Sequence, residues 1–490
     1  MLLLWGPLLC WALLPQAQGE AHSILFLRIS TTKLQTNISD LLEKHEVLGG
    51  LVRMPVLGAA GKGVPVLHRL PFVSDDLSNK KGGLDLSLVS DLLSGRKFPV
   101  LEELLQAGGL VIEDAQGPEI TLDILSDSLL QVTLRCKLYL SLQEILWLKI
   151  IKNIRIGIRL EQVGNKTQVA LEECHVPPGY LDIEILQQTD SLLLNKLLQL
   201  LSNVLDKFLP YLLQKLVCPT VTTLIKLLLE DLLHISLPPI IEGPNDFQYY
   251  VTSTEFTEEA ILMRVLLVTP CGPDQPAPQA EPAPSVSLPQ LSQGSMADLV
   301  FGLEVYNNLL RCLCTRTHVA PVDSLNEIAA NLMKLLSVRE PGLKASNQST
   351  ENLDLVIRTQ DPPAVHLDGR RATVTQQGSL LLLGPNATSS NSVSWQLLSK
   401  AVFSSKDQKL ELQFNPHRAK VTLGAYPAGL KEQEESLKGL LLTLLKRSFL
   451  PQHNKWLREC GLPLPHIKGV SFSQAQMEFS QVYMLLTVPE

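Results

Sequence analysis

Residues 191–218, SLLLNKLLQLLSNVLDKFLPYLLQKLVC, decide the fold, because leucines recur there every three or four positions. This spacing places the apolar side chains on one face of an α-helix, with Asn195, Gln199 and Asp206 on the opposite face. Pro210 lacks a backbone N–H, so we expect it to kink or curve this helix. The apolar stripe comprises Leu194, Leu197, Leu198, Leu201, Leu205, Phe208, Leu212 and Leu216.

Strand-like and helix-like segments surround this helix in both halves of the chain. Apolar and polar residues alternate over 132–142 and again over 154–160, which predicts half-buried strands. The second half repeats this order more faintly, which indicates two related domains. The remaining expected helices are 31–51, 323–338 and 431–450, and the remaining strands are 353–358, 372–383, 409–414 and 420–423.

A proline-rich segment lies near the middle of the chain. Residues 269–289, TPCGPDQPAPQAEPAPSVSLP, hold seven prolines and show almost no apolar periodicity. Because proline fixes φ and removes a hydrogen-bond donor, this segment is expected to be extended and semi-rigid. We predict a linker at 269–289 between an N-terminal domain, 20–268, and a C-terminal domain, 290–490.

The first nineteen residues are apolar and lack Lys, Arg, Asp, Glu and His. The small residues Ala17 and Gly19 suit a signal-peptidase site, so we predict a signal peptide at 1–19; a buried N-terminal helix is the alternative. No later segment is expected to span a membrane. We therefore predict a secreted, extracellular glycoprotein with sequons at Asn37, Asn165, Asn347 and Asn386.

The cysteine count is odd once Cys10 leaves with the signal peptide. One cysteine is then unpaired, or paired between two chains. Cys136 lies on the apolar face of its expected strand, which favours a buried free thiol. Cys312 and Cys314 are expected to be disulfide-bonded or free, because no partner cluster of metal-binding spacing accompanies them. The seven are Cys136, Cys174, Cys218, Cys271, Cys312, Cys314 and Cys460.

Composition and motifs argue against several function classes. The net charge is −7, whereas nucleic-acid binding depends on clustered Lys and Arg. His45 and Glu46 begin like a zinc-protease motif, but the second histidine is missing. The glycine-rich residues 58–63 fit neither the spacing of a P-loop nor that of a dinucleotide-binding turn. We expect no enzyme, no catalytic residues, no metal and no cofactor.

Three features together resemble a known family: Cys174 before the leucine-rich helix with Cys218 at its far end, the central proline-rich segment, and Gly461-Leu-Pro-Leu-Pro465. The chain is similar to the bactericidal/permeability-increasing (BPI) fold family, which includes lipopolysaccharide-binding protein and the PLUNC proteins. It looks most like the long PLUNC members, BPI fold-containing family B. The resemblance implies an α+β boomerang: two domains, each a twisted antiparallel sheet around a long helix, and a shared central sheet. It also implies a Cys174–Cys218 disulfide.

The resemblance further implies a lipid-binding function, since family members hold lipid in an apolar groove between helix and sheet. We expect a monomeric, non-enzymatic carrier of phospholipid or lipopolysaccharide in mucosal innate defence or chemosensory secretions, with peripheral contact to membranes or bacterial surfaces. An intermolecular disulfide stays open. The alternative is a surface-active structural or interaction protein without a defined ligand, which uses a leucine-rich exterior at interfaces. The alternative to a lipid groove is that the helix leucines are core residues that pack only against their own sheet. The expected groove-lining residues are Leu194, Leu197, Leu198, Leu201, Leu205, Phe208 and Leu212.

Overall fold

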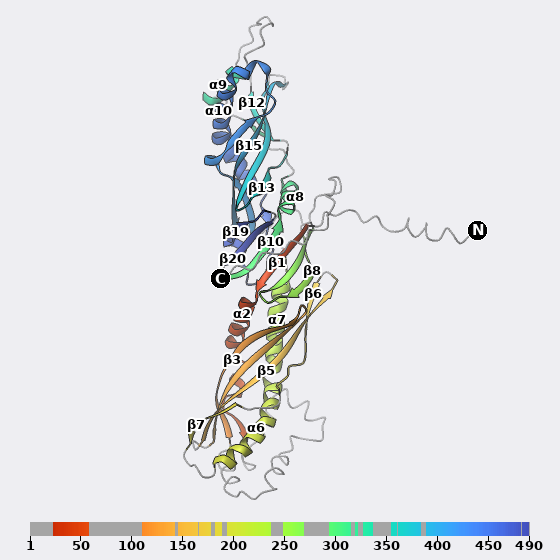
Figure 1. Cartoon of the computed structure of the whole chain (residues 1–490), viewed down its shortest axis with the longest axis vertical. Helices are drawn as coiled ribbons and strands as arrows, with labels where there is room; N and C mark the ends of the chain where they lie inside the picture. The colour runs from red at the N-terminus through yellow and green to blue at the C-terminus, as the bar shows by residue number, and fades with distance from the viewer. Residues whose placement is uncertain are drawn as a thin grey trace, which may run out of the picture.

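The computed structural model is elongated, with three antiparallel sheets arranged along its long axis (Figure 1). Sheet-forming segments dominate, and helices lie along the two outer sheets, as expected for the α+β fold class. The structure describes residues 23–57, 110–142, 146–164, 166–177, 182–188, 194–236, 248–268, 294–314, 319–321, 327–336, 354–359, 361–383, 389–481 and 483–489.

The central sheet combines strands from both halves of the chain. Its order is β19-β20-β10-β1-β9-β8, so the N-terminal strand β1 lies between β9 and β10. Leu27 of β1 faces Leu299 on one side and Met263 on the other. The shared central sheet is thereby confirmed. Its strands are β1 (Ser23–Ser30), β8 (Gln248–Phe256), β9 (Ala260–Val268), β10 (Ser295–Gly302), β19 (Gln476–Phe479) and β20 (Tyr483–Pro489).

The sheet of the N-terminal lobe has the order β2-β3-β4-β5-β6, and β7 pairs with β5. The alternation over 132–142 and 154–160 lies within its two long strands, β4 and β5, which extend beyond the expected limits. Strong alternation marks the interior of a strand better than its ends. The strands are β2 (Met54–Leu57), β3 (Leu110–Ser126), β4 (Leu129–Leu142), β5 (Leu146–Val163), β6 (Lys166–Leu171) and β7 (Asp182–Gln188).

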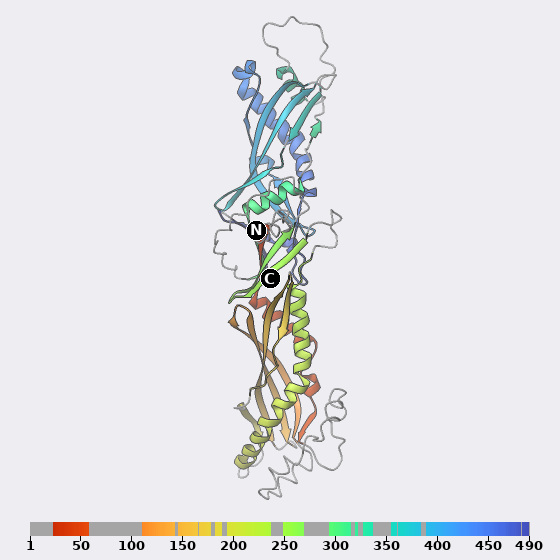
Figure 2. The ribbon, with the colours of Figure 1, turned by 90° about the vertical axis from the view of Figure 1, so that its right-hand side faces the viewer.

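Among the described residues, the helices that accompany this sheet are α2 (Thr31–Lys44), α6 (Leu194–Leu216) and α7 (Cys218–Leu233). The Ser30 side chain caps α2 by accepting from the Lys33 N–H. This helix ends before residue 51, and a short 3-10 turn, η1 (Gly49–Leu51), follows it. Pro210 lies inside α6, where it removes the N–H that would bond the Asp206 carbonyl. Figure 2 shows α6 and α7 as one bent rod beside the sheet.

The C-terminal lobe repeats this plan with an eight-stranded sheet of order β11-β12-β14-β15-β16-β18; β13 pairs with β14, and β17 with β15. Strand β15 and helix α8 were not anticipated from the sequence. The strands are β11 (Val319–Pro321), β12 (Asp354–Thr359), β13 (Ala364–Asp368), β14 (Arg371–Leu383), β15 (Ser389–Lys406), β16 (Lys409–Phe414), β17 (Lys420–Leu423) and β18 (Leu462–Pro463).

The helix expected over 431–450 is longer and irregular. A π-helical turn, η6 (Leu445–Phe449), lies just before Pro451. Proline cannot donate to the preceding helical turn, and the wider turn accommodates this loss. The helices and 3-10 turns of this lobe are α8 (Leu303–Leu313), α9 (Glu327–Leu336), η4 (Pro416–Arg418), η5 (Ala428–Gln433), α10 (Glu434–Leu444), α11 (Leu450–Glu459) and η7 (Phe472–Gln474).

The expected signal peptide, 1–19, and the linker, 269–289, lie outside the described residues. The proposed division into domains 20–268 and 290–490 therefore stays a prediction. Within the described parts of the chain, no helix combines the length and apolar character needed to cross a bilayer.

Candidate functional site

The inner face of the N-terminal sheet is apolar along its two long strands. On β4 every second residue from Leu130 to Leu142 is buried, and all are apolar. On β5 the same alternation buries Leu146, Leu148, Ile150, Ile154, Ile156 and Ile158. The fold thus assembles a hydrocarbon surface, interrupted on β5 at residue 152, from residues that the period of two places on one side.

Helices complete this hydrocarbon interior. Leu205 and Leu209 of α6, Ile225 of α7 and Ile38 of α2 belong to the same cluster of buried residues as the strand positions. Leu209 was missed by the sequence analysis, although it lies four residues after Leu205 and continues the stripe. The helical residues of this interior are Leu34, Ile38, Leu42, Leu201, Leu205, Leu209, Leu212, Leu213, Val221, Ile225, Leu229 and Leu232.

The seven expected groove residues all lie on α6. Leu201, Leu205 and Leu212 are buried, and Leu198 is half-buried against the same core. The side chains of Leu194, Leu197 and Phe208 are outside the described part of the structure. The helix thus directs the described leucines inward. Contact between these residues and a lipid stays a prediction.

One charged side chain interrupts the inward row of β5. Lys152 is only 4% exposed, and its ammonium lies 3.6 Å from a carboxylate oxygen of Asp206 on α6. Its neighbour across the strands is Cys136, which is buried on β4. Sequence analysis missed Lys152; the signal was its position between Ile150 and Ile154, where the alternation requires an apolar residue. Lys152 is thus a buried charge within an apolar interior, and its partner Asp206 is partly exposed.

A disulfide fixes the helical rod to the sheet, as the family resemblance implied. Cys174 and Cys218 are joined, with their Cα atoms 5.9 Å apart. Cys218 begins α7, and the segment around Cys174 pairs with β5 through the bridge between His175 and Arg155. The bond therefore anchors the junction of α6 and α7 beside the edge of β5.

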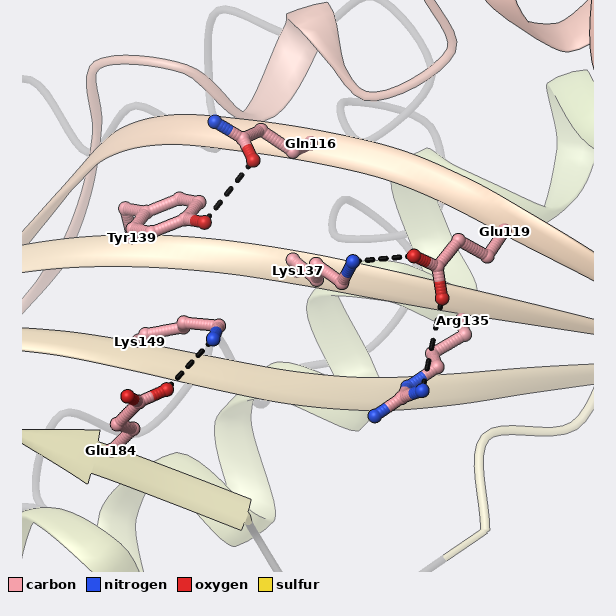
Figure 3. Close-up of polar contacts among 7 residues, drawn as sticks. All are labelled: Gln116, Glu119, Arg135, Lys137, Tyr139, Lys149 and Glu184. Atoms are coloured by element: carbon pink, nitrogen blue, oxygen red, sulfur yellow. Dashed lines mark hydrogen bonds and ion pairs between the residues drawn. The ribbon is translucent and has the colours of Figure 1, made fainter.

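The outer face of the same sheet is polar and carries ion pairs (Figure 3). Glu119 pairs with Lys137 and, at 3.7 Å, with Arg135. Lys149 pairs with Glu184 at 2.7 Å. These contacts hold the pKa of Glu119 below and that of Lys149 above their usual values. Because Arg135, Lys137 and Lys149 each lie beside a carboxylate, these contacts weaken the positive field of this face toward an anionic surface.

The other cysteines take different states. Cys136 is a buried free thiol, as expected, and burial raises its pKa to about 12. Cys312 is disulfide-bonded, whereas Cys314 and Cys460 are buried free thiols. In the described parts of the chain, no group of three or more His, Cys, Asp and Glu could hold a metal ion.

Of the four expected glycosylation sites, Asn37 lies in the middle of α2 and is half-buried. Its neighbour Ile38 is fully buried against the core. Asn165, Asn347 and Asn386 lie outside the described residues. Glycan attachment stays a prediction at all four.

A depression of about 470 Å³ lies in the C-terminal lobe, near the hairpin of β15 and β16 and the end of α11. Cationic and anionic side chains nearly balance in its wall, so it does not suit an acyl chain. Its lining residues are Lys406, Asp407, Lys409, Glu411, Lys455, Arg458 and Glu459.

Known proteins share sequence similarity with this chain. BPI fold-containing family A member 1 of Sus scrofa is 30% identical over 201 residues, which is 40% of this chain and 77% of that protein. The chain belongs to the BPI/LBP/PLUNC family. A model of the LBP / BPI / CETP family, N-terminal domain, also matches residues 69–232 of this BPI-fold chain.

The fold agrees with a solved structure of the same family. The crystal structure of lipopolysaccharide binding protein covers 94% of this BPI-fold chain and 98% of its own, with a TM-score of 0.50 and 15% sequence identity. At that identity the match supports the fold. The assignment to family B, expected from the sequence, stays a prediction.

Proposed function

We propose that this BPI-fold protein is a secreted, non-enzymatic carrier that holds phospholipid or another hydrophobic ligand between the helices and inner sheet faces of its lobes. The apolar inner face of β4 and β5 beneath α6 carries this proposal, together with family membership. Each buried CH₂ contributes ~0.8 kcal/mol, so a chain of about a dozen could gain roughly 10 kcal/mol before association costs.

Phospholipid is the preferred ligand class over lipopolysaccharide. The related fold of lipopolysaccharide binding protein makes lipopolysaccharide a necessary test ligand. However, the net charge of −7 and the paired cations of the outer sheet face provide little attraction for a strongly anionic surface. A role in mucosal defence or chemosensory secretions, and a monomeric state, belong to the same proposal.

We further propose that the polar end of the ligand lies near Lys152, within an otherwise apolar inner face. The matched comparison is Lys152→Met against Lys149→Met, because Lys149 lies on the same strand but faces outward. A charged hydrogen bond contributes about 1.5–3 kcal/mol, so Lys152→Met should reduce affinity for phosphatidylcholine vesicles by about tenfold or more. Lys149→Met should leave that affinity unchanged. Equal effects of the two substitutions would contradict this placement.

The main test is native mass spectrometry of the full chain, purified from a eukaryotic secretion host. A carrier should retain lipid at a defined stoichiometry, and exchange it for added phosphatidylcholine. A clean apo mass with strong lowering of surface tension would instead support the surface-active alternative. That alternative would use exposed apolar side chains such as Leu125, Val163 and Leu227.

Two leucine substitutions separate the alternatives further. Leu205 is buried on α6, whereas Leu227 on α7 is 54% exposed. For a carrier, Leu205→Asn should reduce bound lipid and Leu227→Asn should not. For a surface-active protein, Leu227→Asn should weaken the effect on surface tension instead. A melting curve for each variant verifies that it is folded before its lipid content is compared.

A further inference from the structure

Two cysteines from distant parts of the chain meet inside the C-terminal lobe. Cys314 ends α8, where its N–H donates to the Leu310 carbonyl at 2.9 Å. Cys460 ends α11, where its N–H donates to the Trp456 carbonyl at 3.2 Å. Cys314 is 2% exposed and Cys460 is 9% exposed, and the two thiols hydrogen-bond to each other.

The surroundings of Cys314 and Cys460 favour a disulfide between them over two separate free thiols. Both helix ends are held by their own backbone hydrogen bonds, and α8 packs against β18, the strand that follows Cys460. Neither cysteine belongs to a metal-binding cluster in the part of the chain that the structure describes. Cys136, by contrast, is a buried thiol whose pKa is raised by burial, with no cysteine among the causes.

The other cysteines indicate the chemistry to which this pair is exposed. Cys174 and Cys218 form a disulfide, and Cys312, two residues before Cys314, is also disulfide-bonded. Disulfides form and persist in oxidising compartments. Conditions that oxidise these cysteines also act on two thiols already in contact.

We propose that Cys314 and Cys460 form a disulfide in the mature protein, an oxidative modification that joins the end of α8 to the end of α11. The oxidant is a disulfide of the secretory compartment, either a protein disulfide or oxidised glutathione. The Cys460 thiolate attacks one sulfur of this oxidant, which releases one thiol and leaves a mixed disulfide. The Cys314 thiolate then attacks Cys460 Sγ and releases the second thiol. Two protein thiols are thereby oxidised and one external disulfide is reduced to two thiols.

The order of attack follows from the hydrogen bond between the two groups. The Cys314 thiol donates to Cys460, which lowers the pKa of Cys460 and raises that of Cys314. The thiolate is the nucleophile, and Cys460 is also the more exposed of the two. Cys460 is therefore the first to react.

The disulfide would connect an element next to the central sheet with an element next to the C-terminal sheet. Helix α8 directly follows β10 of the central sheet, and β18 of the C-terminal sheet begins two residues after Cys460. Tyr306 of α8 already packs its ring against Phe301 of β10 and Phe403 of β15. A covalent link at the other end of α8 would hold this helix to the lobe at both ends.

The test maps disulfides in the full chain secreted by eukaryotic cells. The protein is denatured without reductant, alkylated with iodoacetamide and digested with trypsin, which releases Cys460 within residues 459–468. We expect this peptide to be unlabelled before reduction, linked to the peptide that contains Cys314, and labelled after reduction. Full labelling of Cys460 before reduction would overturn the proposal. A link from Cys460 to any cysteine other than Cys314 would do the same.

Two variants complete the test, because Cys312 and Cys314 leave trypsin in one peptide. Cys314→Ser should make Cys460 fully available for alkylation without reductant. Cys136→Ala, which removes the isolated buried thiol, should leave Cys460 protected. Continued protection of Cys460 in Cys314→Ser would show a different partner and refute the pair. Mapping of the unmodified chain decides the matter if either variant is not secreted.

Discussion

Arg28 of β1 and Asp298 of β10 form a buried ion pair, with guanidinium nitrogen and carboxylate oxygen 2.8 Å apart. The two residues are direct neighbours across the strands, although 270 positions separate them in the sequence. Thr487 faces Asp298 from β20 on the other side. One polar row thus joins three strands, contributed by both halves of the chain, at the centre of the molecule.

Removing one partner of this pair should destabilise the protein strongly. Arg28→Met leaves a buried carboxylate without its cation, which costs about 3–5 kcal/mol. Replacing both residues, Arg28→Met with Asp298→Leu, should cost much less or nothing, because no charge is then buried. Denaturant unfolding measures both. The exposed pair of Arg264 and Glu255 is the control, and Arg264→Met should change the free energy of unfolding by less than about 1 kcal/mol.

The same pair predicts a pH dependence of stability. Burial raises the pKa of Asp298 above its usual 3.8, despite the neighbouring Arg28. The folded protein therefore binds a proton at this site more readily than the unfolded chain does. Its contribution to stability is largest below the usual pKa and declines as pH rises through the raised value.

Comparison with Asp298→Asn isolates this contribution, since other titrating groups are common to both proteins. The free energy of unfolding of the unmodified chain, minus that of the variant, should fall as pH increases from about 4 and then level off. Denaturant unfolding at several pH values gives the difference. A difference that grows with pH would mean that Arg28, and not burial, controls this carboxyl group.

The Cys174–Cys218 disulfide should contribute substantially to stability. It spans 44 positions in the sequence, and on the chain-entropy model such a crosslink stabilises by roughly 4 kcal/mol. The double variant Cys174→Ala with Cys218→Ala should therefore melt at a markedly lower temperature. Cys136→Ala tests whether loss of any buried cysteine has this effect. Identical melting curves for the double variant and the unmodified chain would contradict the role assigned to the bond.

Two glycines in the C-terminal lobe should respond oppositely to alanine. Gly378 of β14 lies opposite Trp395 of β15, and an added Cβ would come within 2.3 Å of that indole and 2.8 Å of the Arg358 carbonyl oxygen. Gly378→Ala should therefore cost about 1–3 kcal/mol. Gly439 is exposed on α10 with open space around it, so Gly439→Ala should stabilise by about 0.5–1 kcal/mol. Thermal unfolding distinguishes the two signs.

Local periodicity predicted the elements whose pattern is repeated over many residues. Strand β4 was visible because its inward positions are apolar throughout, and α6 because its leucines keep helical spacing. Strand β15 was missed because serines occupy several of its positions, and serine favours turns and caps over strands. Helix α7 was missed because apolar residues occur on more than one of its faces, which weakens the helical period.

The features that depend on tertiary contact could not be predicted in this way. Lys152 interrupts an apolar row, and the sequence does not show that Asp206 of α6 lies 3.6 Å from it. The contact of Cys314 with Cys460 depends on where two helices end in space. The Cys174–Cys218 bond was anticipated only through a family resemblance, because cysteine counting alone leaves several pairings open.

Strand β1 is the first of its sheet to be synthesised, yet it lies between two strands made much later. Its edge along Leu25–Ile29 pairs with Phe301–Ala297 only after more than half of the polypeptide has left the ribosome. Until then the nascent chain carries an open strand edge with apolar side chains, a template on which another chain can add. Completion of the middle of this molecule is therefore a late step of its biosynthesis, and that edge must be protected until β10 is synthesised.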